Sequence, residues 1–443
     1  MNETAIELND LQGNVLCGYG HPHARYTFLS FSSAAAARRL IAALAPRVRN
    51  AVPWGDDRPS STLNVALTYE GLRALELPED LLTTFPKDFR DGMAANAALL
   101  GDRGESAVEN WDPDLAPRSL HALVTVYGAD PQAHGAEVEQ LADDLARVAP
   151  GVTVAHTVEA GLLADQREHF GFRDGFSQPS IRDDVAGPTV GEGTPLRFGR
   201  WRDVAPGEFV LGYEDEDGSP PRAPGAPFDR NGSFMVVRKL RQHVDRFTAF
   251  LRDRAGPDRA RQDWLAAKLL GRWQDGTPLE RWPDRPGGGD VDASDLNAFR
   301  FRGDRAGLRC PVGAHIRRAN PRDALGWQGR LTKRHRIVRR GMPYGPPPED
   351  RAVDDGEERG LMFVCFQASI ARQFEVVQGR WLNDGDAFGL GDDRDFLVGL
   401  GSPGGKMTVP GDPPLVLRPQ PDFVTTRGGD YFFVPSLTAL GWL

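Results

Sequence analysis

One order of segments occurs twice along this chain of 443 residues, and it limits the possible folds more than any other feature. An apolar, strand-like run is followed by a stretch with the spacing of an amphipathic helix. In the first half, residues 26–31 (YTFLSF) precede a helix candidate at 33–48, and residues 119–127 (SLHALVTVY) precede another at 135–148. The first half therefore holds two strand–helix units.

The second half repeats this order. Residues 233–238 (SFMVVR) precede a helix candidate at 242–252, and residues 361–366 (LMFVCF) precede an amphipathic stretch at 369–382. Two strand–helix units in each half predict an α+β fold in which a ferredoxin-like domain is used twice. Each copy is expected to be an antiparallel sheet with helices packed on one face.

The composition between the halves places the domain boundary. Residues from about 182 to 230 are dense in Gly, Pro and Asp, which is typical of a linker. We predict an N-terminal domain at 1–225 and a C-terminal domain at 226–443. A second Pro- and Gly-rich stretch at 275–295 is expected to be a surface excursion of the C-terminal domain.

Charge and hydropathy exclude several classes of partner. A net charge of -9 and a pI near 5.6 argue against a general nucleic-acid or anionic-membrane surface. No apolar run approaches the ~20 residues that a membrane-spanning helix needs. The opening MNETAIE has no export-signal pattern, which predicts a cytoplasmic protein. Cys17, Cys310 and Cys365 fit neither a disulfide framework nor a paired-cysteine zinc site.

An acidic residue stands among glycines and aromatics in residues 170–179 (FGFRDGFSQP). Asp174 could simply cap the backbone of an Asp-Gly turn. It could also be a general base at the wall of a pocket, where the glycines let the backbone approach a bound group. This segment alone leaves both interpretations open.

Two basic segments follow in the second half. In residues 310–322 (CPVGAHIRRANPR), His315 could be a hydrogen-bonded core histidine. Imidazole is also a common axial ligand of haem iron, and the nearby arginines would suit the two haem propionates. Residues 336–345 (RIVRRGMPYG) could be a solvated basic face, or could bring Arg339 to the same site.

Together these segments resemble the dye-decolourising peroxidase family, whose Gly-X-X-Asp-Gly fingerprint corresponds to residues 171–175 (GFRDG). The other matching motifs follow in the family's order: QGNVL at 12–16, HIR at 315–317, NPR at 320–322, RRG at 339–341, FQAS at 366–369, VQ at 377–378 and GGDYFFVP at 428–435. The resemblance covers nearly the whole chain, and it is greatest to the family's larger, non-exported branch.

The resemblance implies a duplicated ferredoxin-like fold with one haem b per chain, bound mainly by the second domain. It implies a peroxidase that reduces hydrogen peroxide while it oxidises dyes, phenols or other organic electron donors. By position, His315 would be the proximal iron ligand, Asp174 the distal acid and Arg339 the distal arginine. The residues expected to line the haem are Gly175, Phe176, Ser177, Asn320, Pro321, Arg322 and Arg339.

These roles lead to a mechanism and to two further expectations. Asp174 would move the proton of peroxide, and Arg339 would stabilise the charge of the departing oxygen. Because an ordinary Asp has a pKa of ~3.9, turnover should be best in acid.

The second ring nitrogen of His315 needs a partner, for which we expect Glu375, with Asp384 and Asp386 as alternatives. Tyr344 and Trp381 are candidates to relay electrons from bulky donors, although both could serve only in core packing.

Two other functional classes fit parts of this pattern. The chain could carry or demetallate haem without peroxidase turnover, although Asp174 and Arg339 would then have no use. It could also be a haem oxidase with a dedicated biosynthetic substrate, which the sequence does not separate from a broad peroxidase. A non-haem protein in which all three segments are turns is a further alternative. The sequence leaves the oligomeric state open, including a homo-oligomer.

Overall fold

Nine strands form one antiparallel sheet that closes on itself. In this computed structural model, which describes residues 5–115, 117–182, 190–196, 200–288, 291–329, 331–399, 405–418 and 420–443, the strand order is β7-β13-β2-β3-β1-β4-β9-β10-β8. A further pairing joins β7 to β10, so eight strands make a closed barrel. The short strand β8 lies beyond β9 along the same edge of β10.

The barrel consists of two halves with the same internal order. The first half contains β1 (His23–Phe31), β2 (Ser61–Leu67), β3 (Ala122–Gly128) and β4 (Val152–Gly161). The second contains β7 (Ser233–Gln242), β8 (Val338–Arg339), β9 (Met342–Tyr344), β10 (Gly360–Gln367) and β13 (Val424–Val434). The central neighbours are β1 and β3 in the first half and β7 and β10 in the second, as in a ferredoxin-like sheet. The predicted duplicated α+β fold is confirmed.

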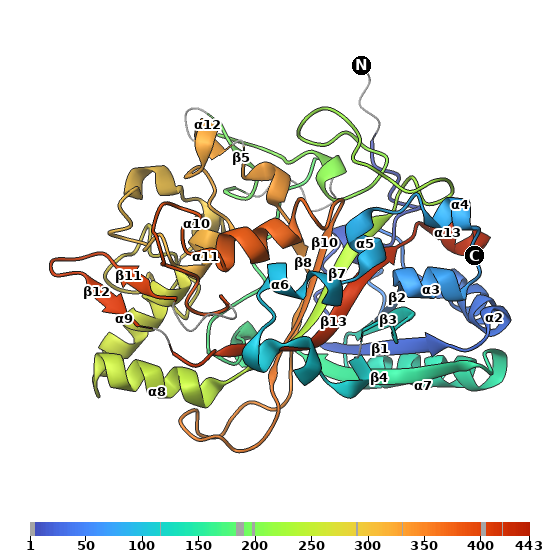
Figure 1. The fold of residues 1–443 in the computed structure, drawn as a ribbon, viewed down its shortest axis with the longest axis horizontal. Coiled ribbons are helices and arrows are strands. Elements are labelled where there is room, and N and C mark those ends of the chain that lie inside the picture. Colours follow the sequence, from blue (N-terminus) through green and yellow to red (C-terminus); the bar gives the residue numbers. More distant parts are fainter. Residues whose placement is uncertain are drawn as a thin grey trace.

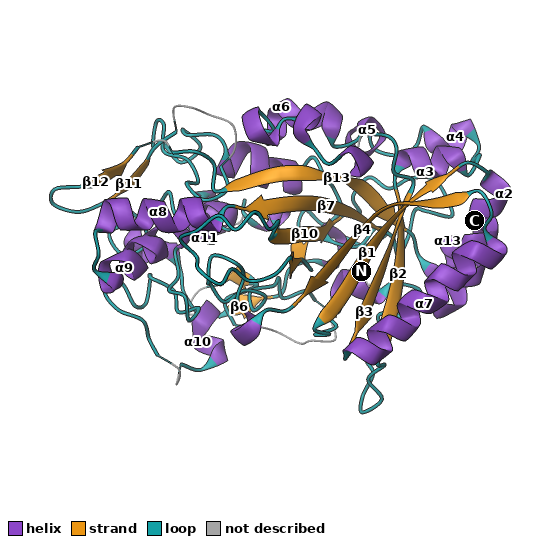
Figure 2. Cartoon of the chain, turned by 90° about the horizontal axis from the view of Figure 1, so that it is seen from below, coloured by secondary structure: helices purple, strands orange, loops and turns teal. Residues whose placement is uncertain are grey.

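Helices cover the outside of each half (Figures 1 and 2). The first half carries α2 (Ala34–Leu44), α3 (Tyr69–Ala74), α4 (Glu79–Leu82), α5 (Lys87–Asp91), α6 (Ala97–Leu100), α7 (Pro131–Val148) and the C-terminal α13 (Leu437–Trp442). The second half carries α8 (Val244–Ala255), α9 (Arg259–Leu270), α10 (Ala293–Asn297), α11 (His315–Ala319), α12 (Gly326–Gly329) and a π-helix (Val376–Leu382). Short α1 (Gly13–Leu16) precedes β1.

Local sequence explains where the longer helices begin. The Asp130 carboxylate accepts the Ala133 N–H at 2.8 Å, and Pro131 occupies the first turn of α7. The Ser33 hydroxyl caps α2 in the same way. Among the described residues, no helix is both long and apolar enough to cross a membrane.

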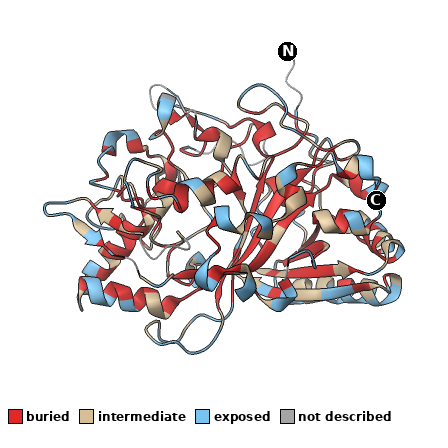
Figure 3. Cartoon of the chain, in the orientation of Figure 1, coloured by how far each residue is buried: buried red, intermediate tan, exposed pale blue. Residues whose placement is uncertain are grey.

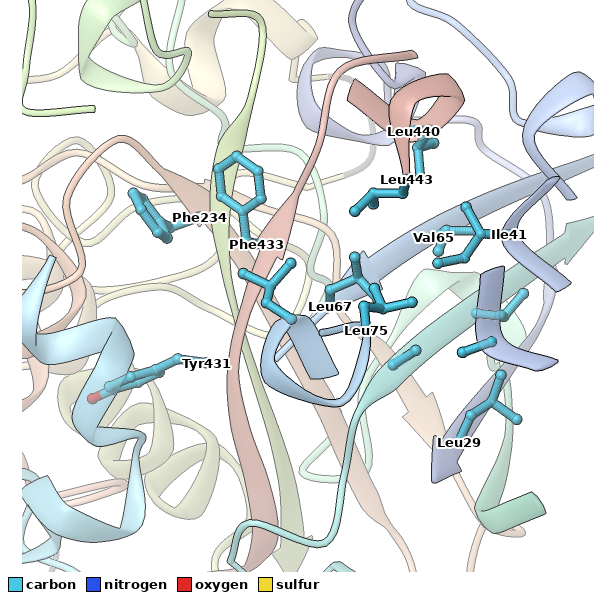
Figure 4. Packing of buried hydrophobic residues seen from close by; sticks show 14 of the residues in the cluster. Leu29, Ile41, Val65, Leu67, Leu75, Phe234, Tyr431, Phe433, Leu440 and Leu443 are labelled. Carbon is cyan, nitrogen blue, oxygen red and sulfur yellow. The ribbon is translucent and has the colours of Figure 1, made fainter. Parts of the chain in front are cut away.

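Strand alternation divides the core into two layers. Side chains inside the barrel form one cluster that includes Tyr26, Phe28, Met235, Val237 and Phe432. The alternate residues of the same strands point outward and pack against helices, as Figure 4 shows for Leu29, Val65 and Ile41 of α2. Figure 3 shows the buried residues along the strands and the inner sides of the helices.

A third cluster lies under α8 and α9 in the second half, and it includes Phe170 and Phe172 from the segment that follows β4. This segment belongs to the first half in sequence. Its aromatic side chains are nevertheless packed with Phe247 of α8, at 4.7 Å between the rings of Phe170 and Phe247. The packing brings the Asp174 turn to the second half of the molecule.

Candidate active site

Asp174 lies in a tight turn directly after Phe172. Its backbone N–H donates to the Gln166 carbonyl at 3.2 Å, and its Oδ1 accepts the Gly175 N–H at 2.7 Å. Gly175 has a φ of +88°, a conformation that a glycine adopts without steric cost. The Asp-Gly turn considered in the sequence analysis is therefore present. It holds the carboxylate of Asp174 in a fixed direction.

Arg339 reaches this turn from β8, where it is paired with Cys365 of β10. Its Nη1 donates to the Oδ1 of Asp174 at 3.3 Å, and its Nη2 donates to the Ser177 carbonyl at 3.0 Å. Its backbone N–H donates to the Gln178 side chain at 2.9 Å. The fold thus joins two motifs that are 165 residues apart in the sequence.

The charge state of Asp174 is set by two opposing influences. Burial raises the pKa of its carboxyl group, whereas the positive charge of Arg339 and the Gly175 N–H lower it. The lowering influences are larger in sum, so the pKa of Asp174 lies below its ordinary value. Asp174 is therefore a carboxylate even in moderately acidic solution.

His315 begins helix α11, and its ring is fixed by Asp395. The Nδ1 atom of His315 lies 2.7 Å from the Oδ2 of Asp395, whose side chain is fully buried. The other oxygen of Asp395 accepts the N–H groups of Leu397 and Val398 at 3.0 and 2.8 Å. Burial lowers the pKa of His315, but the Asp395 carboxylate outweighs it and raises that pKa. The arrangement leaves Nε2 as the ring nitrogen that could bind a metal.

Glu375, the predicted partner of His315, is elsewhere. Its Oε1 accepts the hydroxyl of Tyr431 at 2.9 Å. Asp384 and Asp386 are not the partner either, because the single N–H at the Nδ1 of His315 is directed to Asp395. The expectation of Glu375 was wrong, since its side chain faces β13 rather than α11.

His315, Asp174 and Arg339 lie near one another in the folded chain. The pKa of His315 is affected by both Asp174 and Arg339, so the three groups lie within electrostatic range. Burial is the largest single influence on the pKa of both His315 and Asp174, although neighbouring charges and hydrogen bonds outweigh it in sum. Even so, 28%, 42% and 34% of the side chains of His315, Asp174 and Arg339 remain accessible. Accessible surface on groups so deep in the protein indicates an internal space that a bound group could fill.

Comparisons with known proteins agree with this geometry. A family model described as the DyP dimeric alpha+beta barrel domain matches residues 10–161, and the Dyp-type peroxidase C-terminal model matches residues 222–390. The multifunctional dye peroxidase DyP2 of Amycolatopsis is 31% identical over 99% of this chain and 96% of its own length. This chain belongs to the dye-decolourising peroxidase family. It is thus a hydrogen-peroxide-dependent haem peroxidase.

Further relatives support the assignment. Dye-decolorizing peroxidase msp1 of Mycetinis scorodonius is 30% identical over 99% of this chain and 88% of its own length. A solved structure of an ancestral D-type dye-decolorizing peroxidase is 28% identical, with a TM-score of 0.85 and 99% coverage of both chains.

Buried arginines surround the motif residues of this dye-decolourising peroxidase. The guanidinium group of Arg272 is influenced by those of Arg322 and Arg339, that of Arg322 by Arg336, and that of Arg336 by Arg339. Glu192, which is fully buried, accepts from Arg336 at 2.9 Å and from the Ser177 hydroxyl at 2.6 Å. It lies 3.6 Å from Arg322. Burial and the neighbouring charge of Arg322 lower the pKa of Arg272 to about 9.

The predicted haem-lining residues fall in two groups. Gly175, Phe176 and Ser177 lie on the Asp174 turn, and the Phe176 ring lies 4.8 Å from the guanidinium of Arg272. Arg322 is instead committed to protein groups, because its Nη1 donates to three carbonyls, including that of Gly191 at 2.6 Å.

Asn320 and Pro321 follow α11 directly. Within the described part of the chain, the buried Oδ1 of Asn320 has no hydrogen-bond partner.

Tyr344 and Trp381 are both buried. The Tyr344 hydroxyl donates to Glu358 at 3.1 Å. The Trp381 ring meets the His335 ring edge to face at 5.0 Å, and its carbonyl accepts from Arg318 of α11 at 2.5 Å. Trp381 therefore lies beside the helix that carries His315, whereas Tyr344 lies at the junction of β9 with β4.

Proposed function

We propose that one haem b binds in the internal space at His315, Asp174 and Arg339, here called the hollow. The Nε2 of His315 would hold its iron, and Asp174 and Arg339 would act on the peroxide. The observation that carries this proposal is the proximity of these three side chains, which come from distant segments of the sequence. The hydrogen bond that the Nδ1–H of His315 donates to Asp395 fixes the orientation of the imidazole and increases its electron donation. When bound, the haem supplies the iron that reacts with peroxide and holds the oxidising equivalents.

The charges around the hollow suit the two propionates of a haem. Among the described residues, Arg322 and Arg336 lie within ion-pair distance of Glu192, and Arg339 lies within ion-pair distance of Asp174. No ion pair of Arg272 is found there, so four guanidinium groups stand against two carboxylates. Two positive charges are thus left without a carboxylate. Buried positive charge is unfavourable unless an anion compensates it. We assign the propionates to this arginine cluster, in which Arg272, Arg322 and Arg336 each also donate to backbone carbonyls.

Asp174 and Arg339 have complementary tasks with hydrogen peroxide. Asp174 is deprotonated, so it can take a proton from one oxygen of peroxide and return it to the other. Arg339 keeps a permanent positive charge 3.3 Å from that carboxylate and stabilises the negative charge of the departing oxygen. The Gly175 and Ser177 contacts keep both groups in place before peroxide arrives.

The organic donors of this peroxidase are proposed to be dyes, phenols and similar reductants. Two similar proteins, from Amycolatopsis and Mycetinis, have names that describe them as dye peroxidases. Bulky donors cannot reach a space of this kind directly, so electrons would pass through aromatic side chains. Tyr344 and Trp381 are the proposed relay, and the position of Trp381 beside α11 supports its part in it.

A haem carrier or demetallating protein is less well supported. A carrier needs an iron ligand and a cationic rim, but it has no need for a carboxylate and an arginine aligned on each other. Within the described site, Asp174 and Arg339 are aligned by five hydrogen bonds, two at the carboxylate turn and three from the arginine, with one shared between them. A dedicated biosynthetic oxidation would use the same residues.

The test of the haem site is reconstitution of His315→Ala with haem, followed by absorbance. We expect the Soret band of the imidazole-bound haem to be lost and to return when free imidazole is added. His23→Ala, which changes a histidine on β1, is the matched control and should resemble the wild type. An unaltered Soret band in His315→Ala would contradict the proposal.

A further inference from the structure

Tyr431 and Glu375 form a buried hydrogen-bonded pair that the peroxide chemistry does not use. The Tyr431 hydroxyl donates to the Oε1 of Glu375 at 2.9 Å. The two residues are only 1% and 6% exposed. In Figure 4 the Tyr431 ring extends from β13 away from Leu67 and Leu75, with its oxygen far from the strand. A buried phenol is thus held directly against a buried carboxylate.

Strand register places Tyr431 on the same side of the sheet as Arg339. Tyr431 of β13 is paired with Val236 of β7, Val236 with Cys365 of β10, and Cys365 with Arg339 of β8. Directly paired residues point to the same face of a sheet. With about 4.8 Å between neighbouring strands, Tyr431 and Arg339 are separated by about 14 Å along the curved sheet, and the direct distance between their Cα atoms is shorter.

Aromatic rings connect Tyr431 with β10, the strand that pairs with the strand of Arg339. The ring centroids of Tyr431 and Phe374 are 6.3 Å apart, and those of Phe374 and Phe363 are 6.0 Å apart. Phe363 is two residues before Cys365 on β10, so it points to the same face as Arg339. The contacts form a continuous aromatic path from the phenol towards the peroxide-binding side.

The charges near the pair favour removal of an electron. Glu375, Asp88 and Asp91 are negative groups that act on one another, and Arg238 is the cation that acts on Tyr431. Arg238 is itself paired with the buried Asp102. Asp91 is likewise paired with Lys87, so Glu375 and Asp88 are the groups that leave the surroundings of the phenol negative on balance. Burial raises the pKa of Glu375, which makes it a better acceptor for a phenolic proton.

Other tyrosines lack this combination. Tyr19 and Tyr213 donate to the amide oxygens of Asn64 and Asn231, which are poor proton acceptors. Tyr344 does donate to a carboxylate, that of Glu358, but the Glu358 side chain is 38% exposed. Among the described residues, Tyr431 is the phenol whose carboxylate partner is also buried.

We propose that Tyr431 is a redox-active tyrosine of this peroxidase and that Glu375 is its proton acceptor. After peroxide has oxidised the haem, Tyr431 gives it one electron, and the phenolic O–H bond breaks as its proton moves to the Oε1 of Glu375. The product is a neutral tyrosyl radical. An organic donor later returns one electron, and Glu375 returns the proton. The inference rests on the proposed haem site.

The experiment is electron paramagnetic resonance of the haem-reconstituted full chain, frozen soon after peroxide is added without an organic donor. We expect a tyrosyl signal that narrows when the protein contains ring-deuterated tyrosine. Tyr431→Phe should lose this signal. Glu375→Gln should lose or strongly reduce it, because the amide cannot accept the proton. Tyr213→Phe, whose phenol lacks a carboxylate partner, should keep it.

Absorbance of the same samples separates the two proposals. A normal Soret response in Tyr431→Phe, together with loss of its radical signal, supports the inference. A normal Soret response with an unchanged signal in both Tyr431→Phe and Glu375→Gln overturns it and leaves the haem site intact. A wild-type Soret band that does not respond to peroxide overturns both proposals.

Discussion

The Nδ1 of His315 and the Oδ2 of Asp395 are 2.7 Å apart, although 80 residues separate them in the sequence. Because this carboxylate increases the electron donation of the imidazole, we predict that Asp395→Asn raises the reduction potential of the bound haem. Loss of such a partner typically lowers metal affinity or activity by about 10- to 100-fold. Spectroelectrochemistry checks the potential, with Asp384→Asn as control; equal potentials in both variants would refute the role of Asp395.

The lowered pKa of Asp174 predicts how activity depends on pH. Its carboxylate form is needed, so kcat/KM for peroxide should be retained in acid and should fall only as the pH drops through the lowered pKa. Any stability that this carboxylate contributes is lost over the same range. In Arg339→Leu the main lowering influence is gone and burial remains, so the acid limb should move to higher pH. An acid limb at the same pH in both proteins, or a wild-type optimum above neutrality, would contradict this account.

The buried ion pair between Arg238 and Asp102 is expected to contribute to the stability of the fold. Both side chains are nearly inaccessible, at 2% and 0%. Asp102→Ala leaves a buried cation unpaired, which costs about 3–5 kcal/mol of unfolding free energy. The double variant with Arg238→Met should be less destabilised than the single one.

Urea unfolding followed by circular dichroism measures both values. The control is Lys87→Met, which breaks the exposed pair with Asp91 and should change the free energy of unfolding by about 0–1 kcal/mol. A loss for Asp102→Ala no larger than that of the control would show that the buried pair is unimportant.

The aromatic relay can be tested with donors of different size. We predict that Tyr344→Phe combined with Trp381→Phe slows oxidation of a bulky dye, while the reaction with peroxide keeps its wild-type rate. Trp264→Phe, on α9, is the control for loss of an indole. Steady-state rates with the dye and stopped-flow rates with peroxide provide the comparison. Unchanged dye turnover, or equal loss of both reactions, would count against the relay.

Short motifs were sufficient to find the centre of the site. Asp174, His315 and Arg339 each lie in a recognisable short motif, and the structure brings all three together. No motif marks Asp395. Its position beside His315 results from the closure of a long loop, which the local sequence does not indicate. Glu375 was chosen from a helix expected at 369–382. The structure forms a π-helix only from Val376 to Leu382, and it turns Glu375 towards Tyr431.

The fold was predicted in its repeat but not in its closure. At each of two junctions between the halves, β13 with β2 and β4 with β9, the strands share a single pair of residues: Phe433 with Leu67, and Ala160 with Tyr344. No local sequence pattern indicates these pairings. Strands β2 and β4 lay outside the predicted strand–helix units. The domain division at residue 225 remains a prediction. Phe170 and Phe172 pack with the second half. An apolar side chain packs in whichever hydrophobic core it can reach, whether or not that core belongs to the same half of the sequence.

The central claim is that Asp174 and Arg339 activate peroxide at a haem held by His315. Its most direct test is stopped-flow absorbance of the reconstituted protein mixed with hydrogen peroxide in acid, for wild type, Asp174→Asn and Arg339→Leu. We predict a rapid Soret change in the wild type and a rate about 10²- to 10⁴-fold lower in each variant. A Soret band that peroxide leaves unchanged in the wild type, or equal rates in all three proteins, would contradict the account.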